Sequence, residues 1–366
     1  MLKTFASIAV CGLCVWYVPD ATAVVAHFTA NDRVDAIRRA KVWVSTNVRS
    51  MDLKAGPAGA GSFAPESTAT CDYSQHARGA GHTPKFWCAV APGDVVKVRY
   101  RERNGKLYGL VAATRLFWAL GFGADRAYPV KVVCRGCPAD PWKKGSTATQ
   151  AQVSFDPATI DRRMPGRRLE VKPHEGWAWP ELDRVDESAG GASVAERDAL
   201  KLLAVFVQHT DTKAENQALI CLDEPLRLTE PVNDEDEAGE RRCEHPFMMV
   251  PDLGNTFGHA NTFNRDAASS VNFRDWQATP IWRAKEKGGC VGNLHKSATG
   301  SLDDPHISEA GRKFLADLLV KLSDGQLHDL FDVARFTRRD PSRTVEDWVT
   351  VFKQKRDQIL NATCAP

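Results

Sequence analysis

The most informative segment of the 366-residue chain reads His209-Thr210-Asp211-Thr212-Lys213-Ala214-Glu215-Asn216. It follows a stretch, residues 199–207, that is apolar on nearly all sides, and that stretch is preceded by the capping pattern Ser193-Val194-Ala195-Glu196. A helix of this kind is buried within a larger apolar unit. Because such a helix ends here in a run of polar side chains, we expect those side chains to face a functional site.

Two short strands are predicted downstream, over residues 217–222 and 247–250, and Asp252-Leu253-Gly254 follows the second directly. Taken alone, the first motif would be a polar helix end and the second an ordinary turn. Together, the spacing His-x-Asp-x-Lys-x-x-Asn, the β-hairpin and the Asp-x-Gly turn resemble, in this order, the catalytic region of the protein-kinase superfamily.

This resemblance implies a role for each polar residue. Asp211 would orient the attacking hydroxyl and accept its proton, and Lys213 would place a cation near the transferring phosphoryl group. Asn216 and Asp252 would supply oxygen ligands to Mg²⁺ or Mn²⁺. His209 would fix the loop as a scaffold residue. The implied cofactors are ATP and one of these metals.

The N-terminal half fits the same order of elements. We predict a strand over residues 71–73, a glycine loop over 78–83, and two strands over 85–90 and 95–100 that are joined by Pro92-Gly93. A helix over residues 107–118 and a further strand over 128–134 follow. Lys97 resembles the strand lysine that contacts the α- and β-phosphates in kinases. Gly79 and Gly81 stand where kinases cover the nucleotide phosphates, and the glycines at residues 56–61 are a competing candidate.

The sequence also departs from the family. The carboxylate that should pair with Lys97 is missing, because Gly109-Leu110-Val111 stands at its place and Glu102 precedes the helix. No Ala-Pro-Glu follows Asp252. Because of these departures, a pseudokinase stays open as an alternative. Such a protein would bind a nucleotide or a partner without catalysing phosphoryl transfer.

The N-terminus has the features of a secretory signal peptide over residues 1–23. Lys3 precedes an apolar run, residues 5–18, and Ala21-Thr22-Ala23 forms a small-x-small cleavage site. No later run reaches eighteen apolar residues, so we expect no transmembrane helix in the mature chain. We therefore expect an exported protein, located in the periplasm, the secretory pathway or the extracellular space, which is similar to the atypical secretory-pathway kinases.

Ten cysteines are present, and eight lie beyond the leader, an even number that indicates disulfides in an exported chain. A zinc site is disfavoured, since a single pair has ligand spacing. Strand pairing, proximity in sequence and the predicted hairpin favour four bridges: Cys71–Cys88, Cys134–Cys137, Cys221–Cys243 and Cys290–Cys364.

Charge argues against a general nucleic-acid binder. Lys and Arg number 48 and Asp and Glu 46, which gives a net charge of +2 without a clustered basic excess. The short arginine pairs are interpreted as solvated surface.

The predicted fold class is α+β, in two lobes as in protein kinases: a small antiparallel β lobe with one helix and a larger, mostly helical lobe. Helices are expected over residues 308–322, 324–336 and 345–359 of the larger lobe, and Ser323 with Gln326 and Thr344 with Asp347 predict capping boxes at the starts of the last two. The expected units are a signal peptide (residues 1–23), an N-terminal extension (24–69) and a nucleotide-covering lobe (70–137). An irregular linker or cover (138–192) and the helical lobe with the catalytic loop (193–366) follow.

The leading functional hypothesis is an exported kinase-like phosphotransferase that moves the γ-phosphate of ATP to a hydroxyl of a protein, a sugar or another small molecule. The pseudokinase is the first alternative. The second is a metal-dependent hydrolase that would use His209, Asp211, Asp252 and His259, which leaves Lys97 and the glycine loop without a role.

Overall fold

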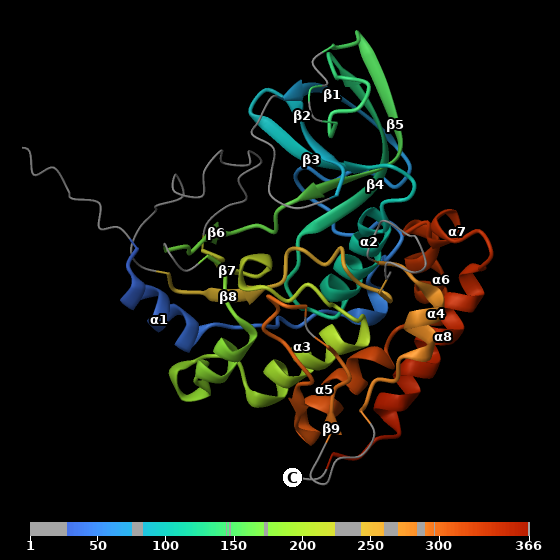
Figure 1. The fold of residues 1–366 in the computed structure, drawn as a ribbon. Coiled ribbons are helices and arrows are strands. Elements are labelled where there is room, and N and C mark those ends of the chain that lie inside the picture. Colours follow the sequence, from blue (N-terminus) through green and yellow to red (C-terminus); the bar gives the residue numbers. More distant parts are fainter. Residues whose placement is uncertain are drawn as a thin grey trace, which may run out of the picture.

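The computed structural model describes residues 28–74, 83–143, 145, 148–171, 175–223, 243–259, 270–283, 290–295 and 297–364. The predicted signal peptide, Gly79 and Gly81, and the whole charge-dense segment 233–242 lie outside these residues. The described chain mixes helices and strands, as expected for an α+β protein. Figure 1 shows a β-barrel at one end of the molecule and most helices at the other, with one helix, α2, between them.

Five strands close the barrel in the order β1 (Thr68–Ser74), β2 (Lys85–Ala91), β3 (Asp94–Tyr100), β5 (Gln152–Arg162) and β4 (Arg126–Arg135). The expectation of a wholly antiparallel sheet is wrong at one pair, because β1 and β4 run parallel. Since β3 and β4 point the same way, a crossover must join them, and α2 (Gly105–Ala119) is that crossover.

Strand β5 corrects the expectation that residues 138–192 are irregular. The strand was not predicted because Pro157 interrupts its sequence pattern, and proline cannot donate a main-chain hydrogen bond to a β-ladder. The β4–β5 register shifts between Val130 and Val132, which is where Pro157 is accommodated. The barrel therefore continues well beyond residue 137.

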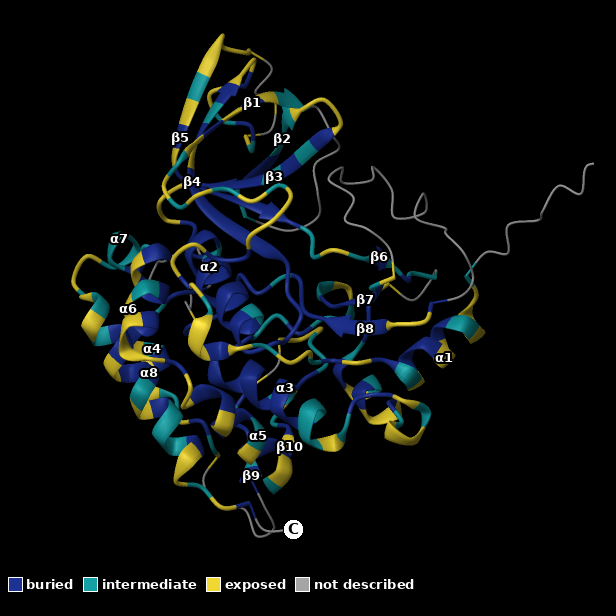
Figure 2. Ribbon diagram, turned by 180° about the vertical axis from the view of Figure 1, so that it is seen from behind, coloured by how far each residue is buried: buried dark blue, intermediate teal, exposed yellow. Residues whose placement is uncertain are grey.

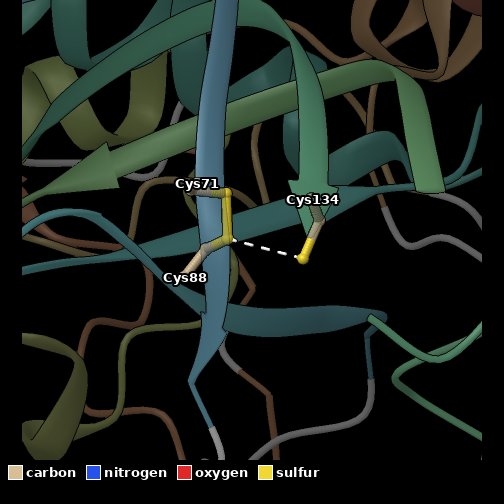
Figure 3. A group of neighbouring side chains, drawn as sticks. All are labelled: Cys71, Cys88 and Cys134. Atoms are coloured by element: carbon tan, nitrogen blue, oxygen red, sulfur yellow. Dashed lines mark hydrogen bonds between the residues drawn. A yellow bond between two sulfur atoms is a disulfide. The ribbon is translucent and has the colours of Figure 1, made fainter. Parts of the chain in front are cut away.

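The barrel has its own apolar interior. On β3, Val96, Val98 and Tyr100 face inward, while Lys97 and Arg99 face outward. Two of the predicted disulfides, Cys71–Cys88 and Cys134–Cys137, are formed at this interior. Figure 3 shows the first beside Cys134, whose sulfur lies 3.6 Å from that of Cys88.

Most other helices form the opposite end of the molecule (Figure 2 shows their buried faces). The predicted capping boxes at Ser193, Ser323 and Thr344 are all present, so the helices begin where the sequence indicated. The helices are α1 (Ala30–Arg39), α3 (Val194–Phe206), α4 (Phe273–Ala278), α5 (Glu309–Leu319), α6 (Asp324–Val333), α7 (Phe336–Arg339) and α8 (Val345–Leu360). Short 3₁₀ turns lie at Val48–Ser50, Trp179–Arg184, Glu187–Ala189 and Ala214–Asn216.

The predicted hairpin after the polar loop is present as β7 (Ala218–Cys221) and β8 (Pro246–Met249), with β6 (Arg167–Arg168) at its edge. The predicted Cys221–Cys243 bridge joins its two arms. The fourth predicted bridge, Cys290–Cys364, ties the C-terminal segment to β9 (Cys290–Val291), which pairs with β10 (His306–Ile307). Within the described ranges, every helix is too short or too polar to cross a membrane.

Candidate active site

The polar loop leaves α3 through a left-handed turn at Gln208, whose φ is 51°. This turn buries the next residue, His209, completely. Within the described part of the chain, neither ring nitrogen of His209 has a hydrogen-bond partner, and its ring centroid lies 6.4 Å from that of Trp179. Burial lowers the pKa of His209 to about 4, so the imidazole is neutral at physiological pH.

Asp211 is the centre of the loop. Its Oδ2 accepts a hydrogen bond of 2.9 Å from Nδ2 of Asn255, and its Oδ1 lies 3.8 Å from Nζ of Lys213. Its main-chain carbonyl accepts a hydrogen bond of 2.9 Å from Nδ2 of Asn216. The structure therefore brings Asp211, Lys213 and Asn216 together, as the sequence predicted, and adds Asn255 as a partner that orients the carboxylate.

Asp252 comes directly after β8 and lies close to Asp211. The two carboxylates meet across Lys106 at the start of α2, whose Nζ lies 3.6 Å from Oδ2 of Asp211 and 3.9 Å from Oδ2 of Asp252. Nη2 of Arg99 lies 3.7 Å from Oδ1 of Asp252. Burial alone would raise the pKa of Asp252, but the charges of Lys106, Arg99 and Lys97 hold it well below its ordinary value.

The carboxylate that pairs with Lys97 comes from a neighbouring strand, whereas the resemblance implies a carboxylate on the helix. Nζ of Lys97 lies 3.1 Å from Oδ2 of Asp161, its direct cross-strand neighbour on β5. Nη2 of Arg99, on the same face of β3, lies 3.2 Å from the same oxygen. Asp161 thus supplies the carboxylate that the sequence failed to show on the helix.

Packing explains why the helix lacks this carboxylate. A Cβ atom at Gly109 would lie 2.9 Å from the carbonyl oxygen of Gly254, in the turn that follows Asp252. A Cβ at Gly254 would in turn lie 3.1 Å from the stem of Lys106. Helix α2 and the turn therefore approach each other more closely than a glutamate at this point would allow.

A row of cations lines the barrel side of the site. We define this cation row as Lys85, Lys97, Arg99 and Lys106. Lys85 on β2 stands directly opposite Arg99 on β3, an arrangement of like charges that is normally unfavourable. Burial, followed by the charges of Arg99 and Lys97, lowers the pKa of Lys85 to about 8. The row therefore brings four cations together, and a polyanion bound there would relieve the repulsion between Lys85 and Arg99.

The two glycine candidates have different outcomes. Gly79 and Gly81 lie outside the described residues. The loop at residues 56–61 packs on two buried arginines, because Cβ atoms at Gly56 and Gly61 would each lie 2.8 Å from the guanidinium of Arg115 and Arg162, respectively. Arg115 is held by main-chain carbonyls of Leu53, Lys54 and Ala55. This second glycine loop thus covers side chains of the protein itself.

Sequence reasoning missed Lys85, Arg99, Lys106 and Asp161. Arg99 could have been found, because it lies two residues after Lys97 and so shares its face of the strand. Asp161 could not, since its strand was not recognised. No sequence pattern identifies Lys106 as a site residue, because its role depends on how closely α2 approaches Asp252.

The histidines proposed for a hydrolase do not join a metal cluster with the two aspartates in the described part of the chain. His259 is exposed, and its main-chain N–H donates to Asp275. His209 is sealed in the interior. This geometry disfavours the hydrolase.

Comparison with known proteins gives little. No family model matches the sequence, and no curated protein matches it. Among solved structures, the chain is similar to a crystal structure described as a Helicobacter pylori proinflammatory kinase, CtkA. The identity is 11%, the TM-score is 0.41, and the match covers 81% of this chain and 96% of that one.

Proposed function

We propose that the protein is an ATP-dependent phosphotransferase with a kinase-like site. One observation carries this proposal: Asp211 of the polar loop and Asp252 after the hairpin meet across Lys106, beside the cation row of the barrel. Phosphoryl transfer requires few covalent steps from the protein and depends on positioning and charge neutralisation. The carboxylates of Asp211 and Asp252 and the cations that face them can provide both the positioning and the charge neutralisation.

In this proposal Asp211 orients the acceptor hydroxyl and receives its proton, while Asn255 holds its carboxylate in place. Lys213 faces the phosphoryl group that is transferred. His209 supports the loop from the interior as a neutral side chain, since it has neither exposure nor a polar partner with which to exchange protons.

A divalent metal suits the donor chemistry. Asp252 offers a carboxylate and Asn216 an amide oxygen, both hard ligands of the kind that Mg²⁺ and Mn²⁺ prefer. Asn216 uses its amide nitrogen on the main chain of Asp211, which leaves its oxygen for another contact. A bound metal would neutralise charge on the phosphate oxygens.

The cation row would hold the phosphates of the nucleotide. Asp161 fixes Lys97 and Arg99 by direct ion pairs, and this fixed geometry reduces the entropy lost on binding. We propose that Gly79 and Gly81 cover the phosphates from the barrel side. The two-lobed kinase-like arrangement belongs to the same proposal, except that the nucleotide-covering lobe extends to residue 162, because β5 completes the barrel.

We further propose that the protein is exported. Four disulfides support this location, because the reducing cytosol does not sustain such bonds in most organisms. The signal peptide at residues 1–23 would direct the export.

Calorimetric titration of the mature chain with ATP tests the site. We expect binding that requires Mg²⁺ or Mn²⁺ and that is lost in Asp252→Asn. Asp317→Asn, an exposed carboxylate on α5, is the matched control and should bind as the wild type does. Equal, metal-independent binding by all three proteins would refute the metal assignment.

Phosphoryl transfer is measured separately, as ATP consumption or autophosphorylation. Asp211→Asn should keep nucleotide affinity and lose turnover by about 10²-fold or more, since positioned proton transfer contributes on the order of 10²–10⁴. Tight ATP binding by the wild type without any transfer would instead identify a pseudokinase.

A further inference from the structure

A pocket of about 650 Å³ opens beside Asp211. Residues from the end of α3, the turn after Asp252, the α4 region and the segment around residues 293–299 contribute to its wall. Its size lies within the range of about 300–1,000 Å³ that is typical of sites for whole small molecules.

Most residues that line this pocket are polar, although carbon atoms form the larger part of its exposed surface. Amide and hydroxyl side chains dominate the lining, and Leu294 is the apolar exception among the described lining residues. Asp275 joins Asp211 as the second carboxylate, and Lys213 and two histidines also line the pocket. With two carboxylates, one lysine and a majority of uncharged polar side chains, the lining suits a neutral ligand with many hydroxyls.

Gln208 provides an independent sign of a ligand. It lines the pocket, is only 8% exposed, and its Oε1 has no hydrogen-bond partner among the residues that the structure describes. Buried carbonyl oxygens are almost always paired, because an unpaired one has lost its water without replacement. The oxygen is almost wholly covered in this structure, so a ligand hydroxyl would satisfy it after a rotation of the Gln208 side chain toward the pocket.

We propose that this pocket binds the phosphate acceptor and that the acceptor is a small, neutral, polyhydroxylated molecule such as a monosaccharide or a cyclic polyol. The proposal rests on the proposed phosphotransferase function and specifies its substrate class. A serine or threonine side chain would fill only a small part of the pocket, whereas a sugar ring can reach both Gln208 and Asp211.

The reaction balances with the residues named. An acceptor hydroxyl oxygen forms a bond to the γ-phosphorus of ATP, and the bond from that phosphorus to the β–γ bridging oxygen breaks, so ADP leaves. The hydroxyl proton passes to the carboxylate of Asp211.

Saturation-transfer NMR on the mature chain without nucleotide tests the pocket, using D-glucose, D-galactose, D-ribose and myo-inositol as probes. We expect at least one probe to bind and Gln208→Met to weaken its binding at least fivefold. The melting temperature of Gln208→Met should stay equal or rise, because the substitution removes an unpaired buried oxygen. Gln354→Met, on the exposed face of α8, is the matched control and should bind as the wild type does.

Thr210→Val removes a different polar group from the wall and replaces Gln208→Met in the binding test if Gln208→Met does not fold. The proposal is overturned if none of the four probes binds, or if binding is unchanged in the folded pocket variants. Transfer of phosphate to a serine-containing protein such as casein, without transfer to any probe, also overturns it. That last result would leave the phosphotransferase intact, whereas loss of metal-dependent ATP binding would count against the proposed function itself.

Discussion

Replacing Lys85 by methionine should stabilise the protein while weakening its affinity for polyphosphates. Burial and the charges of Arg99, Lys97 and Lys106 make the charged form of Lys85 unfavourable, and the charge of Asp252 offsets them only in part. Methionine keeps an apolar stem of similar length and removes the charge, together with the cation–π contact between Nζ of Lys85 and the ring of Trp142, whose centroid lies 5.6 Å away.

The pKa of Lys85 gives the magnitude. Its folded value of about 8 lies below the ordinary value of 10.5. The unfolded chain therefore binds more protons between these two values, and the stability of the wild type rises with pH in that window. Below about pH 8 the charged lysine destabilises the fold by at most about 3 kcal/mol, because one pKa unit corresponds to about 1.4 kcal/mol. Near pH 9.5 about half of this effect remains.

Urea unfolding at about pH 6.5 and pH 9.5 measures the difference between the variant and the wild type. We expect Lys85→Met to be more stable by about 1–3 kcal/mol at the lower pH, by less at the higher pH, and to bind ATP more weakly. Lys131→Met, an exposed lysine on β4, should change stability by no more than about 0.5 kcal/mol. The reasoning is refuted if Lys85→Met is destabilised at pH 6.5, or if its effect does not depend on pH.

Three other substitutions test other parts of the structure. Gly109→Ala should lower stability by about 1–3 kcal/mol and reduce phosphoryl transfer, because its Cβ would clash with the turn at Gly254; unchanged melting and activity would contradict this close contact. Replacing Cys221 and Cys243 together by serine should cost about 3.4 kcal/mol in urea unfolding, as expected for opening a ring with a sequence separation of 22; peptide mapping that shows either cysteine with a different partner would contradict the hairpin. The neutral, buried His209 binds its proton only when the chain unfolds, so lowering the pH from about 7 to 5 should cost about 2 kcal/mol; this slope should disappear in His209→Leu, and a slope that persists would mean that another group causes it.

Local patterns in the sequence determined much of this protein. Capping boxes fixed the starts of α3, α6 and α8 because their hydrogen bonds form between residues three apart. Strand and turn signals around residues 217–250 placed the hairpin and its disulfide. The polar loop and Asp252 were identified for the same reason, since each motif is a short run of consecutive residues.

The tertiary structure alone decided which charges meet. Lys106 bridges Asp211 and Asp252 because two glycines let α2 approach the turn. The partner of Lys97 comes from a strand 64 residues away, whose central proline hid it from sequence patterns. Electrostatic contacts of this kind join residues that are distant in the chain, and no periodicity records them, because they depend on how strands register and how closely helices pack.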